Sequence, residues 1–392
     1  MRYLIISLSM LSLLLTSTAF GKKHLTYGVL MKTLSNPFWG AMEEGVRDGS
    51  KEAGVAYYLQ AVESDQAAEP QLNVCMTMLE RKPDVMITAA INSTILLPCL
   101  KRANEAGIPV VDLDGNLDHD IAKKAGVTID FTIGSDNEAA GAQGADYIAK
   151  VLGNNASGPV LVIEGLSGNI TGQKRARGFA NRIKKIAPGL KVVASLPGDW
   201  DRMKAANITN DILTRYPNLK AIFAANDGMA LGAVESAFAA GKGNDIIIVG
   251  VDGNSDAVKS IKLGRLNASV AQLPYLVGKR AVIGASASLN GLKLAKFQFV
   301  DTLVLTKDVI ENNTWDGAYQ AYMEFCKELN ITPEIVGGNK GVFISNRIAY
   351  HIFQSMNWGL AAALGAILLA VVLILYWAYD KIVGIDNVKL GG

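Results

Sequence analysis

The stretch "ANEAGIPVVDLDG", residues 103–115, decides the fold. It has the pattern of a helix end, a glycine stop, a short apolar strand and an Asp-Gly turn. The stretch "AFAAGKGNDIIIVGVDG", residues 237–253, repeats that order in the second half of the chain. Apolar runs precede both copies at similar distances, "PDVMITAA" at 83–90 and "NLKAIFAAND" at 218–227. Two copies of one unit indicate two related α/β halves.

Short apolar runs alternate with helical patterns on both sides of these repeats. This alternation predicts βαβ units and parallel sheets, and right-handed crossovers place helices on both faces of each sheet. A chain of 392 residues is too long for one ordinary core. The predicted fold class is therefore α/β, with two doubly wound parallel-sheet lobes.

Charge and cysteine content exclude some classes of protein. The formal net charge is only +2, which gives no electrostatic case for binding nucleic acid. Three cysteines, Cys75, Cys99 and Cys326, cannot form a disulfide framework. Cys75 and Cys99 lie in apolar helical patterns, so we expect buried thiols, with a disulfide between the two as the alternative.

The N-terminal segment has the features of a secretory signal peptide. It begins with a positive charge, continues with an apolar core too short to span a bilayer, and reaches the small-x-small site Ala19-Phe20-Gly21. We expect residues 1–21 to be removed before Lys22, with a retained anchor as the alternative. Export predicts a protein of the periplasm or cell envelope.

Residues 358–378, "WGLAAALGAILLAVVLILYWA", contain no charge and have the length of a membrane-spanning helix. Aromatic residues stand at both ends, as in the belts at membrane interfaces. A buried core helix is the alternative, although such a helix usually keeps a polar stripe. We expect an inner-membrane anchor at 358–378, preceded by a linker at 311–357 and followed by a cytoplasmic tail at 379–392.

Candidate binding residues follow the apolar strands, because ligands of open parallel sheets bind outside the carboxyl ends of the strands. These positions contain carboxylates, amides, aromatic rings and a lysine, but no Ser-His-Asp set, Cys-His pair or metal cluster. We therefore expect no catalytic residues, no metal and no cofactor. The candidates are Lys32, Asn36, Phe38, Trp39, Asp114, Trp200, Asn226, Asp252 and Gln272.

This chemistry suits a sugar. Carboxylates and amides hydrogen-bond to neighbouring hydroxyls, and flat aromatic rings cover the weakly polar faces of a sugar ring. Local structure offers alternatives, since Asp114 and Asp252 precede glycine and could simply form turns. Asn226 could cap a helix, and Phe38 or Trp39 could be ordinary core.

Two other motifs are weak evidence for nucleotide or nucleic-acid binding. The Gly-rich stretch "GLSGNITG", residues 165–172, follows a strand and opens a helix, but it matches neither the dinucleotide fingerprint nor the P-loop. The basic run "QKRARGFANRIKK", residues 173–185, has no interleaved aromatics for nucleic acid and is typical of a solvated helix face.

The motifs "MKTLSNPFWG", "VVDLDG", "TIGSDNEAAG", "FAANDGMALG" and "ASVAQLP" occur in this order. Over residues 25–309 the chain resembles the periplasmic sugar-binding proteins of ABC transporters, of the ribose and allose type. The resemblance implies a type I periplasmic binding protein with one lobe from 22–134 and 274–300. The other lobe would comprise 135–273 and 301–310, and the two would close on a monosaccharide like a hinge.

The resemblance also implies roles and partners. It assigns sugar contact to all the candidates above and points to Gln173, where ribose-type members carry an arginine. Gly115 likewise replaces an arginine, so both positions disfavour ribose itself and leave a hexose plausible. The implied partners are the permease and ATPase subunits of an ABC transporter.

The segment from about residue 331 is similar to the last helix of spermidine/putrescine-type ABC permeases. A single helix cannot build a pore, so we expect a fusion that tethers a sugar receptor to the membrane. A fused permease component is the alternative function. A sugar-responsive transcription regulator and an enzyme on the same scaffold are remoter hypotheses.

Overall fold

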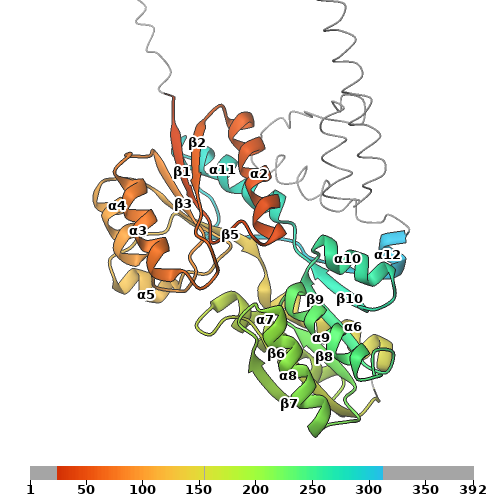
Figure 1. The fold of residues 1–392 in the computed structure, drawn as a ribbon. Helices are drawn as coiled ribbons and strands as arrows, with labels where there is room; N and C mark the ends of the chain where they lie inside the picture. The colour runs from red at the N-terminus through yellow and green to blue at the C-terminus, as the bar shows by residue number, and fades with distance from the viewer. Residues whose placement is uncertain (1–23, 154, 312–392) are drawn as a thin grey trace, which may run out of the picture.

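The computed structural model describes residues 24–153 and 155–311. They form two α/β lobes, each with one sheet of six strands. Figure 1 shows the first lobe in red to orange and the second mainly in green, with teal helix α11 beside α2. The two-lobe α/β architecture predicted from the repeated units is confirmed.

The first lobe has the strand order β11-β5-β4-β3-β1-β2, and all its strand pairs are parallel. Its strands are β1 (Thr26–Leu30), β2 (Ala56–Gln60), β3 (Val85–Thr88), β4 (Val110–Leu113), β5 (Phe131–Ser135) and β11 (Phe297–Val300). Its helices are α2 (Pro37–Ala53), α3 (Ala68–Leu79), α4 (Leu97–Glu105), α5 (His119–Lys124) and α11 (Pro274–Leu289).

The second lobe has the order β12-β10-β9-β8-β6-β7, in which only β12 runs antiparallel to its neighbour. Its strands are β6 (Gly158–Glu164), β7 (Leu190–Pro197), β8 (Ala221–Ala224), β9 (Ile247–Asp252), β10 (Ala268–Ala271) and β12 (Leu303–Leu305). Its helices are α6 (Asn137–Leu152), α7 (Ile170–Ile186), α8 (Arg202–Arg215), α9 (Asp227–Ala239), α10 (Ser255–Lys262) and α12 (Lys307–Glu311).

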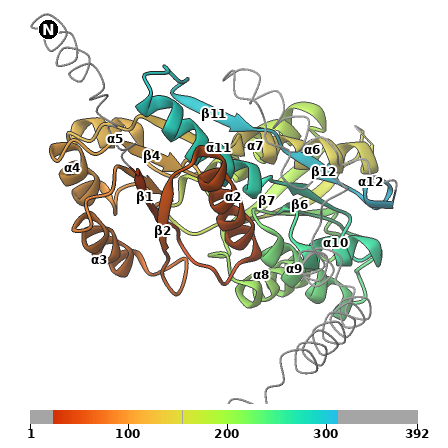
Figure 2. The same ribbon diagram turned by 90° about the horizontal axis from the view of Figure 1, so that it is seen from above.

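Each sheet is covered on both faces, because alternate side chains of a strand point to opposite sides. In β1, Tyr27 and Val29 pack with the α2–α11 layer, whereas Leu30 packs with the α3–α4 layer. In the second lobe α6 and α7 cover one face, and α8, α9 and α10 cover the other. Figure 2 shows α2 and α11 side by side near the middle of the view.

The chain passes between the lobes at three places, from β5 to α6, from β10 to α11 and from β11 to β12. Neither lobe is therefore one continuous stretch of sequence. Connections of this kind suit a hinge, because a few residues at each crossing can absorb a rotation of one lobe against the other.

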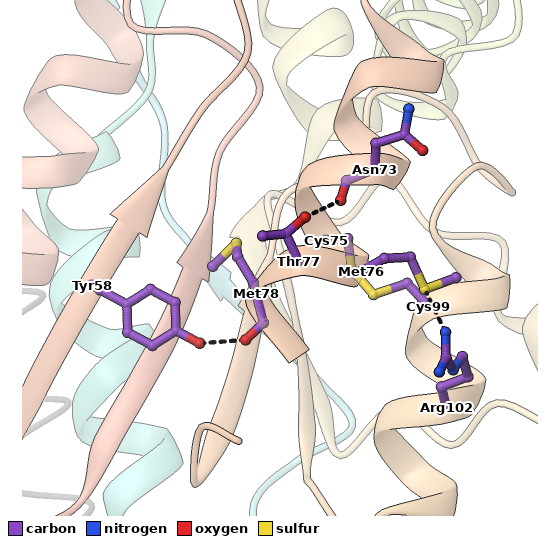
Figure 3. Close-up of a disulfide and its surroundings, with 8 residues drawn as sticks. All are labelled: Tyr58, Asn73, Cys75, Met76, Thr77, Met78, Cys99 and Arg102. Carbon is purple, nitrogen blue, oxygen red and sulfur yellow. Dashed lines mark hydrogen bonds between the residues drawn. A yellow bond between two sulfur atoms is a disulfide. The ribbon is translucent and has the colours of Figure 1, made fainter. Parts of the chain in front are cut away.

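The expectation of two buried thiols is wrong. Cys75 of α3 and Cys99 of α4 form a disulfide with an S–S distance of 2.01 Å, and neither residue is exposed to solvent. Figure 3 shows this bond, with Arg102 donating to the Met76 sulfur beside it. The bond covalently links α3 and α4, two helices that pack on the same face of the first sheet.

Several predicted segments lie outside the described residues: the signal peptide, the greater part of the linker, the membrane helix, the cytoplasmic tail and Cys326. Within 24–153 and 155–311, no helix combines the length and the apolar character that crossing a bilayer requires.

Candidate functional site

A cleft between the lobes encloses about 370 Å³, counting its opening to solvent. Both lobes line it, through the loops at the carboxyl ends of their strands. Its residues are Lys32, Asn36, Phe38, Trp39, Asp65, Asp114, Thr171, Arg175, Trp200, Asn226 and Asp252.

Helix α2 brings the aromatic pair of the first lobe to the cleft. Asn36 caps this helix by accepting a hydrogen bond from the Phe38 amide at 3.0 Å, and Pro37 occupies the first turn. Phe38 and Trp39 meet edge to face, with ring centroids 5.0 Å apart. Both rings also pack into the first-lobe core, so lining the cleft and filling the core are compatible here.

Trp200 supplies the aromatic ring of the second lobe. Its φ of 64° lies in the left-handed region, which non-glycine residues rarely adopt. A Cβ on Gly165 would lie 2.1 Å from Cη2 of the indole, and one on Gly172 would lie 3.0 Å from it. Gly165 and Gly172 thus leave room for an aromatic ring, and Gly168 has a positive φ of 79°, so the three glycines are explained without a phosphate.

Asp114 and Asp252 occupy equivalent places, directly after β4 and at the end of β9. Both have positive φ, 71° and 123°, and both precede a glycine with positive φ. They therefore form the turns that the sequence suggested as an alternative, and they line the cleft as well. Backbone strain of this kind concentrates at functional sites.

Each of these carboxylates faces a buried cation. Lys32 Nζ donates to Asp114 Oδ2 at 3.2 Å, and Arg175 Nη1 donates to Asp252 Oδ1 at 3.2 Å. Lys32 also lies 5.0 Å from the Trp39 ring centroid, and Arg175 lies 6.0 Å from that of Trp200. The two lobes thus present matching sets of cation, carboxylate and indole.

Burial perturbs two carboxyl groups of the cleft. It raises the pKa of Asp252 to about 6, although the Arg175 charge and the Gln272 hydrogen bond oppose the rise. It also raises the pKa of Asp65, where the Lys32 charge opposes the change and Asp114 adds to it. No hydrogen bond to the Asp65 carboxylate occurs within the described residues, so both its oxygens remain available to a ligand.

Asn226 both caps a helix and lines the cleft. Its Oδ1 accepts from the Met229 amide at 2.9 Å at the start of α9. No described residue forms a hydrogen bond with its Nδ2, which leaves an amide donor for a ligand. The cap fixes the side chain, because the oxygen is already engaged.

The structure gathers eight predicted positions around the cleft and separates two from it. Gln272 does not line the cleft, and its Nε2 donates to Asp252 Oδ1 at 2.7 Å, so it orients that carboxylate. Gln173 is exposed on α7 and lies outside the lining, so the structure does not bring it together with the other predicted residues. The eight are Lys32, Asn36, Phe38, Trp39, Asp114, Trp200, Asn226 and Asp252.

Sequence reasoning missed Asp65, Thr171 and Arg175. Arg175 belongs to the basic run that we read as a solvated helix face, yet it is only 4% exposed. Its Nε donates to Asn137 Oδ1 and its Nη1 to the Ala225 carbonyl, both at 2.7 Å. The cleft therefore contains a guanidinium from α7 even though position 173 is glutamine. Asp65 follows β2, where the strand-end rule would have found it.

Comparison with known proteins agrees with this geometry. Residues 27–293 match the family described as the periplasmic binding protein domain. The D-allose-binding periplasmic protein of Escherichia coli is 36% identical over 305 residues, covering 76% of this chain and 97% of that relative.

The chain belongs to the periplasmic binding protein family. A ribose import binding protein of Bacillus subtilis is 32% identical over 280 residues, covering 71% of this chain and 87% of the relative. The crystal structure of a solute-binding protein from Actinobacillus succinogenes with bound D-allose superimposes with a TM-score of 0.69 at 32% identity. That comparison covers 74% of this chain and 99% of the other. These matches support the predicted resemblance to ribose- and allose-type binding proteins.

Proposed function

We propose that this chain is the sugar-binding component of an ABC transporter and captures one monosaccharide between its lobes. The observation that carries the proposal is the composition of the cleft, where three carboxylates, two amides and three aromatic rings converge from both lobes. The sugar class is that of ribose and allose, which the names of the relatives above specify.

The free hydrogen-bonding groups of the cleft suit a neutral polyol. Asp65 offers two acceptor oxygens, and Asn226 offers two donor hydrogens within the described part of the chain. Sugar hydroxyls both donate and accept, so one ring can satisfy such a mixed set. The rings of Phe38, Trp39 and Trp200 cover its faces at little cost in side-chain entropy.

Closure of the hinge couples binding to transport. A sugar that contacts Asp114 of one lobe and Asp252 of the other does so only when the lobes are together. The sugar therefore shifts the open–closed equilibrium toward the closed form. The permease and ATPase subunits of the transporter are the partners that receive the closed complex.

A panel of sugars tests the proposal on the full chain. Ribose, allose, galactose, xylose and an inositol are compared by the rise in melting temperature, because a ligand that binds only the folded form stabilises it by mass action. We expect ribose or allose to give a large shift. A flat response across the panel would contradict sugar capture.

Substitution then localises the sugar. Asp114→Ala removes a lining carboxylate and leaves its hydroxyl partners unpaired, so affinity should fall at least about tenfold in calorimetry. The control is Asp146→Ala, which breaks a surface ion pair with Arg182 on the outside of the second lobe. Equal affinities in both variants would place the sugar elsewhere.

Membrane anchoring through residues 358–378 is a further part of the proposal. The segment is uncharged, and a tether would raise the effective concentration of the receptor near its permease. Protease treatment of sealed inner-membrane vesicles tests it. An anchored receptor sediments with the vesicles, and the protease reaches its sugar-binding part only from the periplasmic side of the membrane. A chain that washes off the vesicles would contradict the tether.

A further inference from the structure

The Gly-rich turn between β6 and α7 packs against the first lobe. Leu166 of this turn contacts a small apolar cluster formed by Val62, Ala67 and Ile91. All three belong to the first lobe, whereas Leu166 follows β6 of the second. The apolar contact therefore spans the two lobes beside the sugar cleft.

Asn116 bridges the same two surfaces with one buried carboxamide. Its Nδ2 donates to the carbonyl oxygens of Ala90 and Ile91, both at 2.8 Å, within the first lobe. Its Oδ1 accepts from the amides of Ile170 at 2.9 Å and Thr171 at 3.4 Å, at the start of α7 in the second lobe. Asn116 is 0% exposed, and its bonds to Ala90, Ile91 and Thr171 are buried, whereas the one from Ile170 is partly buried.

Asn169 of the second lobe forms a further hydrogen bond to the first lobe. Its Nδ2 donates to the Ile91 carbonyl at 3.1 Å across the lobe boundary. Its Oδ1 accepts from the Gly172 amide at 2.9 Å and thereby caps α7. Asn169 is 1% exposed. The Ile91 carbonyl thus receives one donor from each lobe.

Two other polar contacts join the lobes within the described residues. Gln66 Nε2 lies 3.3 Å from the Asp199 carbonyl, and Asn254 Nδ2 lies 3.5 Å from Asn36 Oδ1. The Asn116–Ile170 bond at 2.9 Å and the Asn169–Ile91 bond at 3.1 Å are shorter than these, both asparagines are buried, and neither lines the cleft. We propose that Asn116, Asn169 and Leu166 form a latch that sets how long the closed, sugar-loaded form lasts, without touching the sugar.

The physical basis is the difference between the two states of the hinge. When the lobes separate, water satisfies the amides of Ile170 and Thr171, whereas the Ile91 carbonyl keeps the Asn116 donor and loses only the one from Asn169. When they close, these groups lose water and depend on the asparagines. The bonds of Asn116 to Ala90 and Ile91 lie within the first lobe and are lost from both states alike, so the loss of an interlobe bond destabilises the closed form relative to the open form and speeds opening. The site residues that meet the sugar first are unchanged, so association is spared.

Two variants of the full chain test the latch. Asn116→Ala removes the carboxamide that bridges the lobes. Asn169→Ser keeps an effective helix cap, since serine and asparagine cap about equally well, but is too short to reach Ile91. We expect sugar dissociation to become about tenfold faster in each variant, with association changed less than about twofold.

Stopped-flow tryptophan fluorescence gives both rates, because Trp39 and Trp200 line the cleft. The sugar is the one with the largest melting shift in the panel. The control is Asn104→Ala, which removes an exposed hydrogen bond from the Thr128 amide at 2.7 Å within the first lobe only. It should lower stability and leave dissociation unchanged.

The inference rests on sugar capture by the cleft, and the outcomes separate the two ideas. A wild-type chain that binds no sugar overturns both. If the wild-type chain binds sugar and both variants release it at the wild-type rate, the latch alone is overturned. The latch is also overturned if the variants lose affinity only because sugar association becomes slower. Since Asn169→Ser retains the cap, the test remains decisive if Asn116→Ala fails to fold.

Discussion

Replacing Arg175 with methionine should damage both stability and sugar affinity. The guanidinium makes buried hydrogen bonds to Asn137 Oδ1 and the Ala225 carbonyl at 2.7 Å and to Asp252 Oδ1 at 3.2 Å. Methionine fills much of the same volume but donates no hydrogen bond. Three acceptors therefore lose a donor at once, and Asp252 keeps only the bond from Gln272 among the described residues.

The size of the effect follows from burial. Removing one partner of a buried ion pair costs about 3–5 kcal/mol, and we expect about 3 kcal/mol because methionine preserves packing. Affinity should fall about 30-fold, or about 2 kcal/mol at 1.4 kcal/mol per tenfold, since Arg175 also lines the cleft. Loss of the Arg175 charge also raises the pKa of Asp252 further above its ordinary value. The pH range in which affinity declines on acidification should therefore shift upward.

Urea unfolding and calorimetric titration between pH 5 and 8 measure these effects. The control is Arg177→Met, two residues further along α7, where the arginine pairs with Glu138 at 2.8 Å on the surface. Exposed pairs contribute only about 0.2–1 kcal/mol, so this variant should behave almost as wild type. Equal losses in the two variants would refute the reasoning from burial.

The other predictions concern the disulfide, the buried carboxyl groups and the glycine turn. Replacing Cys75 and Cys99 with alanine should lower the free energy of unfolding by about 3 kcal/mol; urea midpoints equal to those of the oxidised wild type would contradict this. Burial raises the pKa of Asp252 from 3.8 to about 6 in the folded protein. Its stabilising contribution is therefore full below the unfolded pKa and is lost as the pH rises through about 6. The sugar-free chain should have a lower urea midpoint at pH 8 than at pH 5.5, and a higher one at pH 8 would count against it. Gly165→Val should displace the Trp200 ring and weaken sugar binding at least about tenfold; unchanged calorimetric affinity would show that the ring is not part of the site.

The strand-end rule predicted most of the cleft because topology fixes where the carboxyl ends of parallel strands meet. Asp114, Asn226 and Asp252 were found in this way, without any knowledge of side-chain packing. Gln272 also follows a strand, yet its Nε2 already donates to Asp252. A position at the end of a strand predicts that a residue lies near the site. It does not predict whether its polar group is already hydrogen-bonded to a neighbouring residue.

Helix phase explains why Arg175, which the sequence analysis did not single out, lines the cleft while Gln173 does not. Gln173 and Arg175 are two residues apart on α7, which corresponds to a rotation of about 200° around the helix axis. One therefore faces solvent and the other the cleft, and the basic run gave no signal to choose between them. The disulfide could not be predicted because it depends on how two helices pack. A separation of 24 residues in sequence does not reveal that the helices bring the two Cα atoms to 6.2 Å from each other.

Hydrogen exchange of the full chain, measured with and without the sugar of largest melting shift, tests most directly whether a ligand is held between the lobes. Saturating sugar should slow exchange in residues 36–39 and 114–116 of the first lobe and in residues 165–175 and 226–229 of the second. Protection confined to one lobe, or found only away from these four segments, would contradict capture in the cleft.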